Sequence, residues 1–185
     1  MTIWYTGIGS RNTPPGVLEL MVQTAERLAD LGYGLRSGAA QGADSAFEEG
    51  CDRKGGAKEI YLPFKGFQSH RSLCYPPSQE ALGLAARYHP NWMHLSGTAR
   101  ALMARNMHQV LGADLNTPSR FILCWTPDGC QSLLERSSST GGTGQAIALA
   151  SDRSIPVFNL ARQDMEQRIH NFLAHSTPKR GIYGC

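Results

Sequence analysis

Three glycine-bearing segments have the residue types and spacing to bind a phosphate group. They occupy residues 7–11 (GIGSR), 37–44 (SGAAQGAD) and 139–145 (STGGTGQ), and each follows an expected strand and enters an expected helix. The third segment differs in that an expected polar loop, residues 128–140, separates it from its strand. Glycine lets backbone N–H groups approach phosphate oxygens, and the N-terminal end of a helix adds a partial positive charge. We therefore expect a phosphate or ribose site here, with helix capping as the purely structural alternative.

Charged and aromatic side chains near these segments could complete the site. Arg11 and Arg105 could each hold a phosphate through two parallel hydrogen bonds, or simply face solvent. For Arg105 an internal carboxylate such as Asp44 or Asp114 is a second candidate partner, because its helix neighbours are mainly small and apolar. Trp125 could stack on a base or pack in the core. The expected ligand-binding residues are Gly9, Ser10, Arg11, Ser37, Gly38, Gly42, Asp44, Arg105, Asn106, Trp125, Gly141, Gly142, Thr143 and Gly144.

Three carboxylates are candidates for proton transfer if the protein is an enzyme. Asp44 and Glu48 lie one turn apart at the start of an expected helix, and Asp128 closely follows Trp125. Asp44 could bind a ribose hydroxyl, act as a general base, or complement the helix dipole. The catalytic assignment stays open among the three, and no ordered set of Ser, His and Asp stands out.

Standard nucleotide-binding fingerprints are missing from the sequence. The position three residues after Gly9, where a dinucleotide motif has its third glycine, is Asn12, and no Gly-Lys-Ser/Thr occurs. Simple NAD and ATP binding is therefore disfavoured. The cysteines form no Cys-x-x-Cys pair and the histidines no His-x-x-x-His pair, so we expect neither a metal nor a cofactor.

The elements that position these residues alternate between strand and helix. Such alternation implies a parallel sheet with right-handed crossovers. We predict an α/β, Rossmann-like three-layer fold whose five-stranded parallel sheet has the order 3-2-1-4-5. The expected strands are 3–8, 33–37, 58–62, 120–125 and 155–158, and the expected helices are 14–31, 43–54, 78–88, 98–111, 142–150 and 162–174.

The length of 185 residues suits one core of roughly 100–200 residues, so we expect a single domain over residues 1–175. Residues 63–96 break the strand and helix rhythm, which predicts an insertion or a lid with one helix. Its aromatic side chains are too many for a plain solvated loop. Residues 176–185 are expected to form a tail.

Composition narrows the partners and the compartment. The net charge of +3 and pI near 8.7 suit an anionic ligand but fall short of a domain that coats DNA by charge alone. No stretch approaches the ~18 apolar residues of a membrane span, and the N-terminus has no secretory signal pattern. An odd number of irregularly spaced cysteines fits reduced thiols. We therefore expect a cytoplasmic protein without a membrane partner.

Several segments resemble motifs of known families. Residues 37–46 and 105–112 (RNMHQVLG) resemble two segments of the DNA-processing protein A (DprA/Smf) family, and residues 140–158 resemble a later region of it. Residues 141–144 (GGTG) also resemble the glycine motif of the LOG (lonely guy) phosphoribohydrolases. Both families belong to the SLOG superfamily of Rossmann-like nucleotide binders. The chain thus resembles a small stand-alone SLOG member of the phage type.

The chain departs from these motifs at a few positions, and these differences decide which of the implied functions we favour. The glutamate that LOG enzymes use falls near Ile147 or Ala148, and Met107 stands where DprA proteins have a second arginine. The leading hypothesis is binding of a nucleotide or nucleotide-derived signal. The alternatives are a LOG-like nucleotide N-glycosidic hydrolase and DprA-like single-stranded DNA binding. Because both families form dimers, the resemblance also implies a homodimer.

Overall fold

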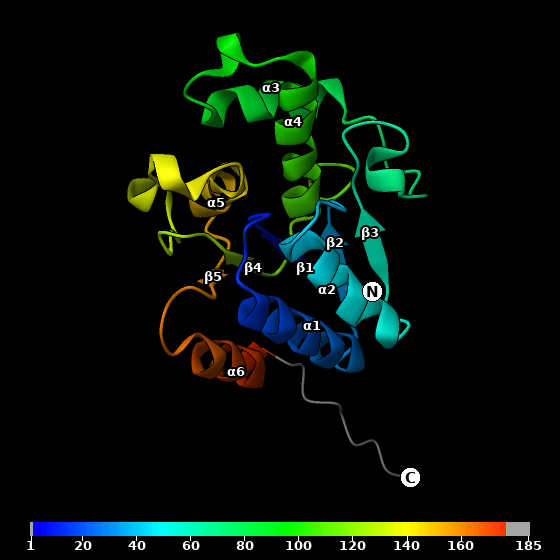
Figure 1. The fold of residues 1–185 in the computed structure, drawn as a ribbon, viewed down its shortest axis with the longest axis vertical. Helices are drawn as coiled ribbons and strands as arrows, with labels where there is room; N and C mark the ends of the chain where they lie inside the picture. The colour runs from blue at the N-terminus through cyan, green and yellow to red at the C-terminus, as the bar shows by residue number, and fades with distance from the viewer. Residues whose placement is uncertain (1, 177–185) are drawn as a thin grey trace.

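The computed structural model, which describes residues 2–176, contains strands and helices that alternate along the chain (Figure 1). The strands are β1 (Ile3–Gly9), β2 (Tyr33–Ser37), β3 (Lys58–Ile60), β4 (Ile122–Trp125) and β5 (Val157–Asn159). The α-helices are α1 (Pro15–Asp30), α2 (Ala43–Arg53), α3 (Gln79–Tyr88), α4 (Gly97–Leu111), α5 (Thr143–Asp152) and α6 (Met165–Ser176). Short 3₁₀ turns are η1 (Phe67–Ser69), η2 (Trp92–His94), η3 (Leu133–Glu135) and η4 (Ser138–Thr140).

The five strands form one parallel sheet in the order β3-β2-β1-β4-β5, which confirms the predicted topology. Thr6 of β1 pairs with Arg36 of β2 on one side and with Ile122 of β4 on the other. The strand order reverses around β1, and loops that leave neighbouring strands in opposite directions open a crevice at such a point. The ends of β1 and β4 therefore mark where a ligand site is expected.

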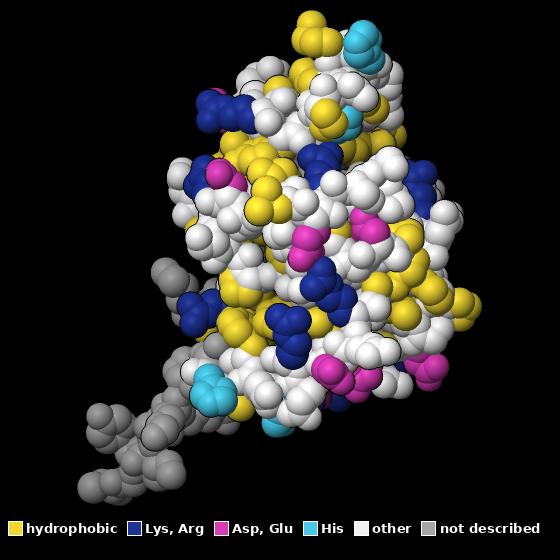
Figure 2. All heavy atoms as spheres, turned by 90° about the vertical axis from the view of Figure 1, so that its left-hand side faces the viewer, with side chains coloured by type: hydrophobic (Ala, Val, Ile, Leu, Met, Phe, Trp, Pro, Cys, Tyr) yellow, Lys and Arg dark blue, Asp and Glu magenta, His cyan; other side chains and the backbone are white. Residues whose placement is uncertain are grey.

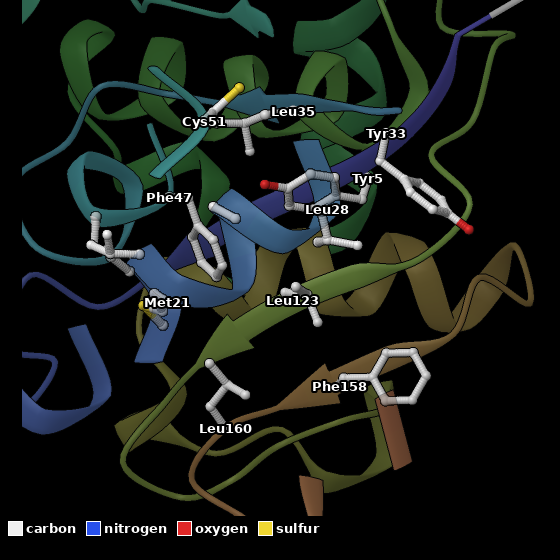
Figure 3. Packing of buried hydrophobic residues seen from close by; sticks show 14 of the residues in the cluster. Tyr5, Met21, Leu28, Tyr33, Leu35, Phe47, Cys51, Leu123, Phe158 and Leu160 are labelled. Carbon is white, nitrogen blue, oxygen red and sulfur yellow. The ribbon is translucent and has the colours of Figure 1, made fainter. Parts of the chain in front are cut away.

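Helices α1, α2 and α6 cover one face of the sheet through a large aromatic and aliphatic core (Figure 3). Tyr5 of β1 stacks on Phe121, with ring centroids 5.8 Å apart, and meets Phe47 of α2 edge to face. Figure 3 shows Met21 and Leu28 of α1 near Leu123 of β4. This layer fixes the position of β1 relative to α2. It therefore also fixes the loop that follows β1 and the loop that precedes α2.

Helices α4 and α5 cover the opposite face, and α3 packs on α4 from outside. Small side chains allow the close approach, because Ala104 of α4 and Ala146 and Ala150 of α5 are fully buried. The two helices lie side by side above the sheet (Figure 1). The result is the predicted three-layer arrangement of helices, sheet and helices.

The predicted insertion, residues 63–96, contains η1, α3 and η2 and follows the short strand β3. The expected strand continues only to Ile60, because Leu62 N–H donates to Cys74 O (3.0 Å) and Tyr61 forms a bridge with Cys74. The aromatic residues of the insertion mostly pack inward: Phe67 is buried, and Tyr75, Tyr88 and Trp92 pack against the two cores. Whether the segment acts as a lid stays a prediction.

Smaller differences from the expected boundaries occur near the C-terminal end. Strand β5 extends to Asn159, whose side-chain amide donates to Thr126 Oγ1 (2.7 Å) and Cys130 O (2.8 Å) and so ties β5 to the polar loop after β4. Helix α6 begins at Met165 instead of Arg162. Most of the expected tail, 177–185, lies outside the described residues. Across residues 2–176, no helix is long and apolar enough to cross a membrane.

Candidate functional site

A pocket of about 320 Å³ opens at the C-terminal ends of β1 and β2, between the middle of α4 and the start of α5. It brings together the three glycine-bearing segments and α4, which are far apart in sequence. The lining residues are Ile8, Gly9, Ser10, Arg11, Asn12, Ala40, Asp44, Leu102, Met103, Arg105, Asn106, Ser139, Thr140, Gly141, Gly142 and Thr143. The pocket therefore lies at the edge where the topology places a ligand.

The loop after β1 is held rigidly at the pocket rim. Ser10 N–H donates to the carbonyl of Trp125 (3.2 Å), and Ser10 O accepts from the Thr13 hydroxyl (2.7 Å). Gly42 has φ +87, and a Cβ there would lie 2.8 Å from Ser10 O, so only glycine allows α2 to begin this close to the loop. Arg11 is exposed on this loop and makes no ion pair with any residue from 2 to 176.

The third glycine segment leads into α5. Among the first N–H groups of this helix, Gly144 donates to Gly141 O (3.1 Å) and Gln145 donates to Gly142 O (3.2 Å), while Thr143 N–H has no acceptor within the helix. Gly142 has helical φ and ψ values of −63 and −26, so the segment already follows the helix direction. Asn106 of α4 donates to Gly142 O (3.3 Å) and joins the segment to α4. The start of α5 thus presents a fixed, partly positive helix end to the pocket.

Asp128 organises the turn that precedes this helix. Its carboxylate accepts hydrogen bonds from Ser137 Oγ (2.6 Å), Thr140 Oγ1 (2.5 Å) and Thr126 Oγ1 (2.8 Å). Burial opposes the charged form, but these hydrogen bonds prevail and lower the pKa of Asp128 well below its ordinary value. Asp128 is therefore a charged anchor for η4 and does not line the pocket.

Arg105 and Asp44 form an ion pair at the floor of the pocket, with 3.2 Å between Arg105 Nη1 and Asp44 Oδ2. The same oxygen also accepts from Ala40 N–H (3.4 Å). Burial raises the pKa of Asp44, and the Arg105 guanidinium works against that rise. Of the two partners expected for Arg105, the structure shows the internal carboxylate. A Cβ at Gly38 would overlap the guanidinium, so that glycine makes room for the pair.

The predicted ligand-binding residues divide into those that line the pocket and those that support it. The lining residues among them are Gly9, Ser10, Arg11, Asp44, Arg105, Asn106, Gly141, Gly142 and Thr143. Ser37 donates to Gly7 O (2.7 Å) inside the sheet, and Gly144 faces Arg136. Gly38, Gly42 and Trp125 are not among the lining residues. Of the other two catalytic candidates, Glu48 bonds Lys58 and His70 outside the pocket, and Asp128 anchors η4.

Several lining residues were not among the predicted ones. Asn12 follows Arg11, and Ser139 and Thr140 precede Gly141, so adjacency to the glycine segments could have indicated them. Leu102 and Met103 lie three to four residues before Asn106, and this spacing puts them on the same helix face. Among the described residues, no group of three or more His, Cys, Asp or Glu side chains is arranged to hold a metal ion.

The fold is Rossmann-like, as the sequence predicts, and solved structures of other proteins share it. The Moco carrier protein of Chlamydomonas reinhardtii matches with a TM-score of 0.51 and 14% identity, over 96% of this chain and 87% of that one. DNA processing protein A of Streptococcus pneumoniae matches with a TM-score of 0.52 and 15% identity, over 96% of this chain and 57% of that one. At such identities the likeness concerns the fold alone.

A third solved structure is DNA processing protein A of Helicobacter pylori, described for its single-stranded DNA binding mode. It matches with a TM-score of 0.42 and 15% identity, over 94% of this chain and 81% of that one. No protein-family model and no curated protein matches the chain.

Proposed function

We propose that the protein binds a nucleotide or nucleotide-derived ligand, with its phosphate seated between the 9–12 loop and the start of α5. The observation that carries the proposal is the convergence of the helix end and Arg11 on one pocket. The charges of Arg105 and Asp44 compensate each other, so Arg11 and the helix end leave the pocket with an unbalanced positive potential. An anion of phosphate size can interact favourably with both Arg11 and the N-terminal end of α5.

The face seen in Figure 2 and the charge of the pocket favour a small ligand over a long nucleic acid. On the face formed by α3, α5 and α6, Lys and Arg side chains occur in separate small groups (Figure 2). Nucleic-acid affinity grows with the number of phosphates neutralised, and one pocket with a single free arginine neutralises few. Filter binding of single-stranded DNA at several salt concentrations tests this alternative, and tight, steeply salt-dependent binding would support it over ours.

We further propose that the ligand is bound without cleavage of its glycosidic bond. Ile147 and Ala148, at the place of the LOG glutamate, are fully buried apolar residues of α5. Asp44 is the carboxylate that lines the pocket, and Arg105 already engages it. Chromatography after prolonged incubation with the four nucleoside monophosphates is expected to find no free base. Release of base would reinstate the hydrolase alternative, with Asp44 as the residue to replace first.

The binding proposal is tested by calorimetry with nucleoside monophosphates and inorganic phosphate. Gly142→Val places a side chain where a phosphate oxygen would sit, and Arg11→Ala removes a charge-assisted hydrogen bond. Each variant is expected to weaken binding roughly tenfold to a hundredfold. For Arg11→Ala the reason is the lost charge-assisted hydrogen bond, which contributes ~1.5–3 kcal/mol, and for Gly142→Val it is the loss of phosphate contacts to the displaced ligand. Gly97→Val is the matched control, since Gly97 also begins a helix and a Cβ there has nothing within 4 Å. Unchanged affinity in Gly142→Val would remove the phosphate site.

A further inference from the structure

The floor of the pocket holds a hydrogen-bond acceptor and a hydrogen-bond donor that have no partner among the described residues. They are Asp44 Oδ1 and Arg105 Nε. Both side chains are deeply buried, with 1% and 6% of their residues' surfaces exposed, and both line the pocket. Buried polar atoms in folded proteins are nearly always hydrogen-bonded, so Asp44 Oδ1 and Arg105 Nε are expected to bond to a group of the ligand.

The chemistry of the two atoms restricts the ligand group that fits. Asp44 Oδ1 needs a donor, because a carboxylate oxygen only accepts, and Arg105 Nε–H needs an acceptor. A phosphate satisfies Arg105 but brings its negative charge against the bare oxygen of Asp44. An exocyclic amine alone satisfies Asp44 but leaves Arg105 unpaired. A base edge that sets a ring nitrogen beside the amine supplies both a donor and an acceptor, and equal affinities for ribose and deoxyribose forms in the test below would favour it. Two neighbouring hydroxyls satisfy both, because each hydroxyl can donate or accept.

We infer that Asp44 and Arg105 recognise the vicinal diol of a ribose, so that the protein selects ribonucleotides over 2′-deoxyribonucleotides. This inference rests on the proposed function, since it places the sugar of the same ligand whose phosphate contacts the start of α5. The lining supports the arrangement: Thr143 and Gly142 lie on the α5 side of the pocket, and Asp44 and Arg105 come from α2 and α4. Loss of one hydroxyl leaves a buried charged group unpaired, which discriminates strongly between related ligands.

The test compares each ribonucleoside 5′-monophosphate with its 2′-deoxy counterpart by calorimetry. At least one ribonucleotide is expected to bind tenfold or more tightly than its deoxy form. Equal affinities would overturn the diol assignment while leaving the proposed function intact. Absence of binding by every nucleotide would overturn both.

The variant Asp44→Asn links the preference to the residue. Arg105 and the Ala40 N–H both donate to the Oδ2 position, so the Asn oxygen takes that position and its NH₂ replaces the free acceptor. The difference between ribose and deoxyribose is expected to fall below about threefold, while phosphate-dependent binding persists. Glu48→Gln is the control, since Glu48 lies one turn along α2 and bonds Lys58 and His70. Discrimination that survives in a folded Asp44→Asn protein would overturn the assignment; if that variant does not fold, the wild-type comparison decides alone.

Discussion

At the scale of single residues, the ion pair between Asp44 and Arg105 is the most consequential contact of the pocket. The two residues are 61 positions apart, and the sequence left the partner of Arg105 open. No local pattern could settle it, because the contact exists only once β1 and β2 bring α2 and α4 to the same sheet edge. The sequence did indicate that Arg105 needs an anionic partner, because its helix neighbours are mainly small and apolar.

Replacement of Arg105 by alanine is expected to lower the free energy of unfolding by about 3–5 kcal/mol at neutral pH, because it leaves the Asp44 carboxylate buried and uncompensated. The loss should shrink as pH falls. Burial already raises the pKa of Asp44, and removal of the arginine raises it further above the unfolded value of ~3.9, so protonation at lower pH relieves the folded variant. Urea unfolding at pH 8 and pH 5 measures both effects. A variant as stable as the wild type at pH 8 would contradict them.

At the scale of elements, the order of the strands and helices was more predictable from the sequence than the structure of the loops. The alternation of apolar strands with helices predicts the strand order. The expected ends of the strands predict that the glycine segments lie at one edge of the sheet. Residues 128–140 were expected as a polar loop, but its ordered turn was not, because that order comes from one carboxylate that accepts from three hydroxyls of residues 126–140. Asp128 was expected near the ligand, but its carboxylate accepts hydrogen bonds from residues of the turn itself.

Asp128→Asn is expected to loosen the start of α5 and weaken phosphate binding several-fold. It should also lower the free energy of unfolding by about 1–2 kcal/mol, less than for a buried charged acceptor because Asp128 is exposed. The folded state depresses the pKa of Asp128, so this stability is complete above the unfolded pKa near ~3.9 and is lost as pH falls below it. Denaturation at pH 7 and pH 3 measures the change.

The matched control for that variant is Asp114→Asn. Asp114 accepts from Thr117 Oγ1 (2.9 Å) and Asn116 N–H (3.0 Å) in a loop away from the pocket, and its pKa is likewise lowered, chiefly by the hydrogen bond from the Asn116 backbone. It should change stability in the same direction and leave phosphate affinity unchanged. An equal loss of affinity in both variants would show that Asp128 has no particular role at the pocket.

The insertion at residues 63–96 is expected to respond to the ligand as a lid would. Leu102 and Met103 line the pocket on α4, and α3 packs against that helix. Hydrogen exchange of the backbone amides in 63–96 should therefore slow when a nucleotide is added. No change in exchange would favour a role for this segment in contacts between protein copies.

At the scale of the whole molecule, two separate cores hold the sheet from both sides, and the pocket lies where α2, α4, α5 and the β1 loop meet. Assembly into a homodimer stays a prediction of the family resemblance. Light scattering at micromolar concentration is expected to give twice the mass of 20.2 kDa. A monomeric mass would contradict it, and the pocket would then have to function within a single chain.

The position of Trp125 gives the protein an optical signal of its own. Trp125 does not itself line the pocket, but its backbone carbonyl accepts from the N–H of Ser10, which does. The rings of Trp4 and Trp92 instead lie beneath the guanidinium groups of Arg36 and Arg100, with the ring centroids 5.0 and 5.6 Å from the respective Cζ atoms. Occupancy of the pocket should therefore alter the emission of one indole of the three. A change in tryptophan fluorescence on adding nucleotide is expected in the wild type and in Trp92→Phe, and its disappearance is expected in Trp125→Phe. Persistence of the change in Trp125→Phe would place the responding indole elsewhere.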